Sequence, residues 1–371
     1  MPFVPFELER WQSTWEKRVR FNIAESGVHA LSVGELLELT GTDPRALSDV
    51  RLSYNQSDGS EDLRTAIADT YHDVGPEQVT VTVGSAEANF IACWSLIEPG
   101  DHVAVVTPTY MQIPGLVRNF GASVAELPLR RELGWRLDLT RLEAAIPTGT
   151  RAVIVTNPNN PTGAVLSDEE RQAIVARTEA VGAWLVSDEV YQGAEFAGPP
   201  TRTCWSDGGK TIVVNGLSKA YGLPGLRIGW LVSSPAFKER VSRRHDYTVI
   251  GPSPASDLLA TIALRHRDAI LARTRRILTE NYPVIDAWLR GFGTTFEWHP
   301  PSCGAITLAR YEHAMRSAEL AERVRAECSV LLAPGAHFGM EHTIRFGFGN
   351  DRTELEAALA TLGPVLRRVL T

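Results

Sequence analysis

The 371-residue sequence lacks long hydrophobic runs. No stretch approaches the ~18 consecutive apolar residues that a membrane-spanning helix needs. The first residues also lack the pattern of a secretory leader, in which a cationic segment precedes an apolar one. These absences argue against a membrane partner, and we expect a cytoplasmic protein.

Cysteine is scarce too. The four cysteines, Cys93, Cys204, Cys303 and Cys328, lie far apart, and no Cys-x-x-Cys pair occurs. Such spacing predicts free, buried thiols in a reducing compartment rather than disulfides or zinc ligands. We therefore expect no metal site.

A basic surface is missing as well. The formal net charge is -7, and the sequence contains no basic run, which argues against a nucleic-acid partner. With 44% hydrophobic and 22% charged residues, the composition is that of an ordinary globular protein. The length suits about two domains.

Strand patterns alternate with helical patterns in the middle of the chain. Four apolar runs rich in β-branched residues lie at 79–83, 103–107, 152–156 and 184–187. The alternation predicts an α/β fold with a mostly parallel, doubly wound sheet that helices cover on both faces. The return from 211–214 to 228–232 is too short for a crossover helix, so we expect that pair to be antiparallel.

The two ends of the chain show a different pattern. The C-terminal third predicts a helical region at 256–290 that breaks near Pro283, followed by mixed strands and helices. The N-terminal residues predict helices at 6–20 and 32–39, with Ser32 and Glu35 spaced as a capping box. We predict a large domain, 45–255, and a smaller α+β domain built from 1–44 and 256–371.

Residues that suit chemistry follow the expected strands. Ligands of an open parallel sheet bind outside the carboxyl ends of its strands. The residues at those ends are Gly84, Tyr110, Asn160, Asp188, Tyr191 and Lys219. We therefore expect one site at this edge of the sheet.

Lys219 is the central candidate in that site. Ser218 precedes it, and the chain returns past it with Arg227. A reactive amine beside a hydroxyl and a guanidinium suggests a covalently held, phosphorylated cofactor. The alternative is a solvated surface charge, which is the usual state of an isolated lysine.

Other residues of the site allow both functional and structural interpretations. Gly84-Ser85-Ala86 opens a helix whose free N–H groups suit a phosphate, although a plain strand-to-helix turn has the same pattern. Asp188 follows an apolar run, so it needs a partner, either a protonated pyridine nitrogen or an arginine. Tyr110 suits ring stacking or simple packing. No pattern ranks Gln112, Trp135, His337 and residues 247–254 as side-chain contacts for a substrate.

Three motifs give the site a family context. They are NPNNPTG at 157–163, SDEVY at 187–191 and SKAYGLPGLRIGW at 218–230. In order and spacing they resemble the class I/II aminotransferases of fold type I, which depend on pyridoxal phosphate. The resemblance implies an amino-group exchange between an L-amino acid and an α-keto acid by an aldimine/ketimine mechanism.

The resemblance also implies roles for individual residues. Lys219 would bind the cofactor covalently, Asp188 would pair with its pyridine nitrogen, and Tyr110 would stack on its ring. Asn160 and Tyr191 would contact the 3′ oxygen. The phosphate would be held by Gly84, Ser85, Ala86, Ser218 and Arg227.

Two further motifs resemble the same family. Tyr54, in YNQSDGSEDLR, resembles the tyrosine that reaches the phosphate of a partner subunit, which implies a homodimer with shared active sites. Arg345, in IRFGF, resembles the arginine that binds the substrate α-carboxylate, and Gly27 resembles the glycine beside that carboxylate.

The N-terminal loop departs from the family pattern. Family members often have Gly-x-Pro where this chain has Gly27-Val28-His29. This short stretch is similar to capreomycidine synthase, a fold-type-I enzyme that cyclises a hydroxylated arginine. His29 is therefore a candidate substrate-side residue, or else a residue that caps or packs the loop. Elimination, cyclisation or oxidation is the alternative reaction, and a non-catalytic ligand-binding protein is a third interpretation.

Overall fold

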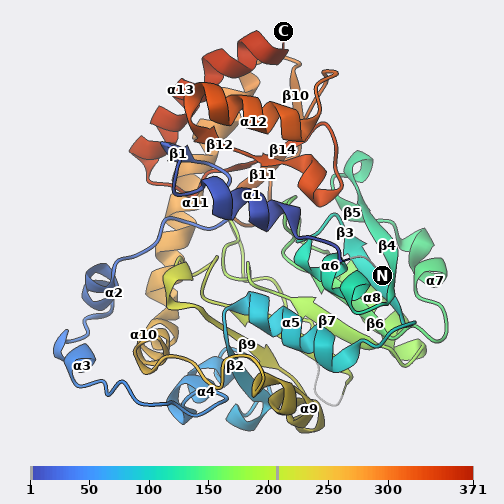
Figure 1. The fold of residues 1–371 in the computed structure, drawn as a ribbon, viewed down its shortest axis with the longest axis vertical. Helices are drawn as coiled ribbons and strands as arrows, with labels where there is room; N and C mark the ends of the chain where they lie inside the picture. Colours follow the sequence, from blue (N-terminus) through green and yellow to red (C-terminus); the bar gives the residue numbers. More distant parts are fainter. Residues whose placement is uncertain (1–2, 206–208, 371) are drawn as a thin grey trace.

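The computed structural model describes residues 3–205 and 209–370. In Figure 1 a large sheet with its helices occupies one end of the molecule, and a smaller sheet with α12 (Ser317–Cys328) and α13 (Arg352–Leu370) occupies the other. The long helix α11 (Arg267–Arg290) runs alongside both.

The large sheet has eight strands in the order β2-β9-β8-β7-β6-β3-β4-β5. Neighbours from β8 through to β4 are parallel, whereas β9 is antiparallel to both β8 and β2, as the short return predicted. The strand bounds are β2 (Val79–Val83), β3 (His102–Thr107), β4 (Ser123–Arg130), β5 (Arg136–Leu137), β6 (Ala152–Thr156), β7 (Trp184–Asp188), β8 (Thr211–Gly216) and β9 (Ile228–Val232).

Helices cover both faces of this sheet, which confirms the doubly wound prediction. Successive strand residues point to opposite faces. In β3, Val103 and Val105 pack into a core with α5 (Ser85–Leu96), α6 (Gln112–Asn119) and α9 (Pro235–His245). Ala104 and Val106 face the opposite core, with α7 (Leu142–Ala145) and α8 (Asp168–Ala180).

Strand β4 was not predicted. Its sequence, SVAELPLR, contains Glu126 and Pro128, which do not fit the pattern of a buried strand. The strand lies near the edge of the sheet, where only the two-residue β5 follows it. Proline is tolerated near a sheet edge because it lacks only the N–H donor.

The smaller sheet has the order β10-β11-β14-β13, and all its pairs are antiparallel. Its strands are β10 (Phe296–Trp298), β11 (Ile306–Tyr311), β13 (Ala333–Pro334) and β14 (Thr343–Gly347). Beside it, β1 (Phe21–Asn22) pairs in parallel with β12 (Val330–Leu331), so N-terminal residues lie against the C-terminal part of the chain. The exact division into two domains stays a prediction.

The N-terminal helices are α1 (Glu7–Trp15) and α2 (Val33–Thr40). Helix α2 begins after the predicted capping box of Ser32 and Glu35. The other short helices are α3 (Arg45–Ser48), α4 (Glu61–Ala68) and the 3-10 turns η1 (Pro76–Gln78), η2 (Arg131–Leu133), η3 (Leu139–Arg141), η4 (Pro224–Leu226) and η5 (Gly335–Phe338).

The predicted helix break near Pro283 is wrong. The break falls instead at His266, between α10 (Pro254–Arg265) and α11, and Pro283 lies inside α11. A proline removes one hydrogen bond from a helix interior. Here Leu278 and Ile285 are fully buried on either side of it, so packing outweighs the lost hydrogen bond.

Within the described residues, no helix is long and apolar enough to cross a membrane. All four cysteines are free, and all except the partly exposed Cys328 are buried.

Candidate active site

A cavity of about 540 Å³ lies at the carboxyl ends of the central strands. Most of the predicted site residues line it, which confirms that the strand ends meet at one place. Those residues are Ser85, Ala86, Tyr110, Asn160, Asp188, Tyr191, Ser218, Lys219, Arg227 and Arg345. Gln112, one of the unranked side-chain candidates, also lines the cavity, but Trp135, His337 and residues 247–254 do not.

Gly27 and Gly84 lie directly behind the cavity wall. A Cβ atom on Gly27 would come within 3.2 Å of the Ser218 carbonyl oxygen and 3.5 Å of Lys219 Cδ. A Cβ atom on Gly84 would come within 2.2 Å of Arg227 Nη2. Both glycines therefore allow a close approach that any side chain would obstruct.

His29 and Tyr54 lie outside the cavity. His29 is exposed, and its Nδ1 lies 3.0 Å from Arg273 Nη2. Partial desolvation of the ring and the charge of the neighbouring Arg273 lower the pKa of His29 below its ordinary value. This position favours the loop-packing interpretation of His29. Tyr54 is 90% exposed, and its role across a subunit boundary stays a prediction.

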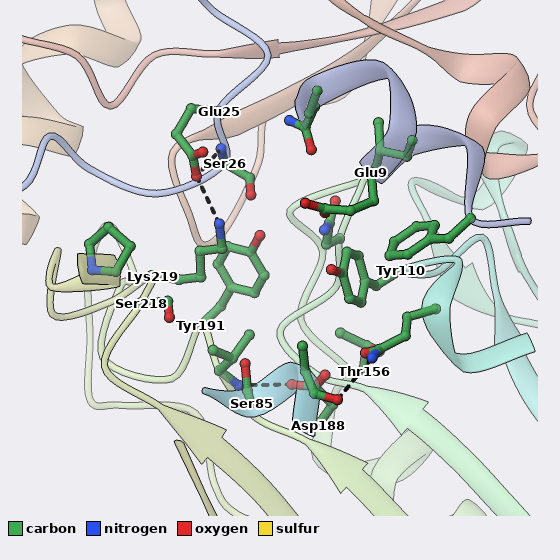
Figure 2. A pocket seen from close by; sticks show the side chains of 18 of the residues that line it. Glu9, Glu25, Ser26, Ser85, Tyr110, Thr156, Asp188, Tyr191, Ser218 and Lys219 are labelled. Atoms are coloured by element: carbon green, nitrogen blue, oxygen red, sulfur yellow. Dashed lines mark hydrogen bonds and ion pairs between the residues drawn. The ribbon is translucent and has the colours of Figure 1, made fainter. Parts of the chain in front are cut away.

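Lys219 is paired with a residue that the sequence motifs did not indicate. Its Nζ donates to Glu25 Oε1 at 2.7 Å, and Figure 2 shows Lys219 extending toward Glu25 and away from Asp188. The charge of Lys219 is the main reason that the pKa of Glu25 falls to about 2. Burial acts to lower the pKa of Lys219, but Glu25 and Tyr191 outweigh it, so the pKa is raised.

Asp188 ends strand β7 and is 3% exposed. Asn89 Nδ2, on α5, donates to its Oδ2 at 2.8 Å, and the Val190 N–H donates to its Oδ1 at 3.2 Å. Burial raises the pKa of Asp188 in spite of these hydrogen bonds. Because no cation pairs with Asp188 among the described residues, a positively charged ligand atom would relieve its desolvation.

Arg227 and the start of α5 form a place for an anion. Strand β9 runs antiparallel to β8, so Arg227, at its N-terminal end, lies at the same edge of the sheet as Lys219. Among the residues that the structure describes, no side chain caps the N-terminus of α5 at Gly84. A helix N-terminus with free N–H groups, a guanidinium and the hydroxyls of Ser85 and Ser218 suits a phosphate.

Arg345, in the middle of β14, enters the cavity from the smaller sheet. It is 1% exposed, and it donates from Nη1 to Asn160 Oδ1 at 2.7 Å and from Nη2 to the Ala24 oxygen at 2.6 Å. Burial lowers its pKa from the ordinary arginine value. The guanidinium has no carboxylate partner among the described residues, so a carboxylate from a ligand would complete the pairing.

Two tyrosines complete the wall around the space between Lys219 and Asp188. The Tyr191 hydroxyl has no hydrogen-bond partner among the described residues, although Ser26 lies near enough to affect its pKa. Burial raises the pKa of Tyr191, and the charges of Lys219 and Arg345 oppose this shift. Tyr110 is held edge-on by Phe6, with ring centroids 5.0 Å apart.

Helix α1 adds a wall that was not predicted. Glu9 and Gln12 of α1, and Glu16 directly after its last residue, line the cavity, and Figure 2 shows Glu9 beside Tyr110. Their spacing of three and four residues places them on one side of the helix. The signal was present in the sequence as the polar side of an amphipathic helix, but such a side is usually exposed to solvent.

The comparisons with known proteins agree with this geometry. The family model of aminotransferase class I and II matches residues 30–362, so the chain belongs to that family. Capreomycidine synthase of Streptomyces vinaceus is 33% identical over 99% of this chain and 94% of its own length. The aspartate/prephenate aminotransferase of Thermus thermophilus is 28% identical over 87% of this chain and 86% of its own length.

Solved structures show the same fold-type-I architecture. A PLP-dependent aminotransferase from Streptococcus suis superposes with a TM-score of 0.93 at 33% identity, covering 99% of each chain. The PLP-dependent cyclase OrfR superposes with a TM-score of 0.92 at 31% identity, covering 100% of this chain and 98% of its own. The chain is therefore a member of a pyridoxal-phosphate-dependent enzyme family, and its cofactor is pyridoxal 5'-phosphate.

The residues in the cavity fit that cofactor. The unpartnered Tyr191 hydroxyl and the buried Asp188 carboxylate are polar groups that a ligand would satisfy. Because Gly84 has no side chain, the Arg227 guanidinium can lie against the start of α5, and together they suit a phosphate. Lys219 supplies an amine within the same cavity.

We expect Lys219→Ala to abolish covalent attachment of the cofactor while the protein stays folded, because this variant removes the amine that lines the cavity. Borohydride reduction of the loaded protein, followed by peptide mass spectrometry, measures attachment. Lys210→Ala is the control, since Lys210 is exposed and donates to the Gly182 oxygen at 2.8 Å, away from the cavity. Wild-type levels of attachment in Lys219→Ala would contradict the assignment.

We expect Gly84→Ala to weaken cofactor binding at least about tenfold, because the new Cβ would displace the Arg227 guanidinium. Gly100→Ala is the matched control. Gly84 and Gly100 have φ of 82° and 92°, but nothing lies within 4 Å of a Cβ on Gly100. Both variants place a side chain at positive φ, which costs about 1–3 kcal/mol of backbone strain. Equal loss of cofactor affinity in the two variants, measured by equilibrium titration, would show that strain alone is responsible.

Proposed function

We propose that the protein is an aminotransferase that exchanges an amino group between an L-amino acid and an α-keto acid. The observation that carries this proposal is the presence of Lys219 and Arg345 in one cavity with Asp188. A base, a carboxylate site and a partner for a protonated ring nitrogen are the groups that chemistry at an amino acid Cα requires.

In the proposed reaction, pyridoxal phosphate supplies the electron sink that makes the substrate Cα proton acidic. Arg345 binds the α-carboxylate, and Asn160 holds the guanidinium in place. Lys219, once free of the cofactor, removes the proton from Cα and returns it to a neighbouring carbon. Asp188 keeps the ring nitrogen protonated, because a cation relieves the desolvation of its buried carboxylate.

We also propose that the active enzyme is a homodimer. Large apolar side chains are exposed on two loops: Leu52 (89%) and Tyr54 (90%) on one, and Tyr247 (84%) and Ile250 (52%) on the other. The loops touch, since a Cβ on Gly251 would lie 3.1 Å from the Gln56 oxygen. A partner subunit would cover this apolar surface and bring Tyr54 to a second active site.

Elimination or cyclisation of an amino acid is the second candidate function. The observation that favours it is the side of α1 that bears Glu9, Gln12 and Glu16, because neither glutamate has an ion-pair partner among the described residues. Such a wall suits a cationic side chain, and two of the similar proteins are a capreomycidine synthase and a cyclase. Both candidate reactions begin with loss of the Cα proton.

A panel of amino donors and α-keto acids separates the two candidates. For transamination, we expect the keto acid of the donor and the amino acid of the acceptor to form in equal amounts, as measured by mass spectrometry. Arginine and hydroxyarginine belong in the panel alongside aspartate and alanine. Consumption of a donor with loss of water and no keto acid would contradict transamination and support the second candidate.

We expect the Glu9→Gln/Glu16→Gln double variant to raise KM for arginine about five- to tenfold, in whichever reaction arginine undergoes. Each partly exposed charge pair is worth up to about 1 kcal/mol. KM for a neutral donor such as methionine should change less than about twofold, because no charge is lost against it. Glu7→Gln is the control, since Glu7 lies on α1 but does not line the cavity. Equal changes for both donors would contradict a charge-selective wall.

A further inference from the structure

Glu25 lies beside the reactive lysine, and no family motif accounts for it. Its Oε1 accepts three hydrogen bonds, from Lys219 Nζ at 2.7 Å, the Ser26 N–H at 2.9 Å and the Gly27 N–H at 3.1 Å. Two of these donors belong to the backbone of its own loop. The carboxylate is therefore held in position independently of the lysine.

The contact between the two loops is tight as well as polar. A Cβ on Gly27 would lie 3.2 Å from the Ser218 oxygen and 3.5 Å from Lys219 Cδ. The backbone that carries Glu25 thus packs directly against the stem of Lys219. This packing helps to fix the distance between the Glu25 carboxylate and Lys219 Nζ.

We propose that Glu25 is a positioning residue that stabilises the ammonium form of Lys219 whenever this lysine is free of the cofactor. The inference rests on the proposed role of Lys219 as the base. When Lys219 accepts a proton, the Cα–H bond of the substrate breaks, an N–H bond forms at Nζ, and the electron pair stays with Cα. Glu25 remains an anion in this step and balances the charge that appears on Nζ.

The other charged groups around Lys219 do not stabilise its ammonium form in this way. Tyr191 acts to raise the pKa of Lys219 only as a phenolate, and burial raises the pKa of Tyr191 itself, so its phenol stays protonated near neutral pH. Arg345 brings a positive charge that opposes protonation of the amine. Asp188, Arg227 and the glutamates of α1 line the same cavity but form no ion pair with Lys219. The charge of Lys219 and the N–H groups of Ser26 and Gly27 lower the pKa of Glu25 in spite of burial, so Glu25 is the anion of the pair.

If the ion pair of Lys219 and Glu25 served only to stabilise the fold, its removal would mainly lower the free energy of unfolding. The side chains of Lys219 and Glu25 are 24% and 44% exposed. An ion pair that water reaches contributes only about 0–1 kcal/mol to the free energy of unfolding. Removing it should therefore change the chemistry of Lys219 much more than the stability of the protein.

The first test measures capture of pyridoxal phosphate by the protein freed of cofactor, without any amino acid. Only the neutral amine attacks an aldehyde, so the capture rate rises with pH through the pKa of Lys219. Because Glu25 acts to raise that pKa, we expect Glu25→Gln to capture cofactor faster at neutral pH, with the midpoint shifted at least about one unit lower. Glu25→Asp should restore most of the wild-type profile.

Glu9→Gln is the control for capture, because it removes a negative charge from the same cavity without any contact to Lys219. Its midpoint should shift by less than half of the Glu25→Gln shift. Equal shifts in the two variants would overturn the proposal in favour of a general effect of cavity charge. Circular dichroism of each variant confirms the fold before rates are compared.

The second test measures exchange of the substrate Cα proton with deuterium from solvent by NMR. Because substrate displaces Lys219 from the cofactor as the neutral amine, the exchange rate depends on the stability of the ammonium that then forms and not on the neutral fraction of the free lysine. We therefore expect exchange to slow several-fold in Glu25→Gln and to recover in Glu25→Asp. Exchange accompanies transamination and cyclisation alike, so it reports on Glu25 even if the donor panel contradicts transamination. An unchanged exchange rate or an unchanged capture profile in Glu25→Gln overturns the proposal.

Discussion

The buried guanidinium of Arg345 joins the parts of the chain that make the cavity. It is fixed to Asn160, in the loop after β6, and to Ala24, in the N-terminal segment, while its own strand lies in the smaller sheet. A buried cation is costly unless polar groups surround it, so these contacts hold the three segments together. The guanidinium that we propose binds a substrate carboxylate thereby also helps to hold the N-terminal segment over the site.

The residues around the expected cofactor could be predicted from sequence because they follow the strands. Asp188 ends β7, Lys219 follows β8 by three residues, and Arg227 precedes β9 directly. A parallel sheet brings such positions to one edge whatever the details of packing. To predict that these residues converge, it was enough to know the order of the strands and that β9 runs antiparallel to β8.

The site residues that sequence reasoning missed lie in segments that do not follow a strand of the parallel sheet, so no general rule places them at the site. Glu25 and Glu9 precede the first strand of the large sheet, and they reach the cavity because tertiary contacts such as the pairing of β1 with β12 hold the N-terminal segment over it. Asn89 lies one turn inside α5, where an amide buried against Asp188 has the same sequence signature as an ordinary helix residue. The two errors in the fold prediction have the same cause. Tertiary packing, which sequence patterns do not reveal, allows α11 to continue through Pro283 and β4 to contain Pro128.

The wall formed by α1 has a consequence for how such a protein can change. Helix α1 is anchored to the smaller-sheet side of the molecule, where Trp11 Nε1 donates to the Leu332 oxygen at 2.8 Å and Leu8 is buried beside Phe338. None of the groups around Lys219 and Asp188 that suit the cofactor belongs to this helix. Under the proposed function, the residues of α1 that would contact a substrate side chain thus lie in a different stretch of sequence from those that would hold the cofactor, so mutations in α1 can change substrate preference without altering the cofactor site.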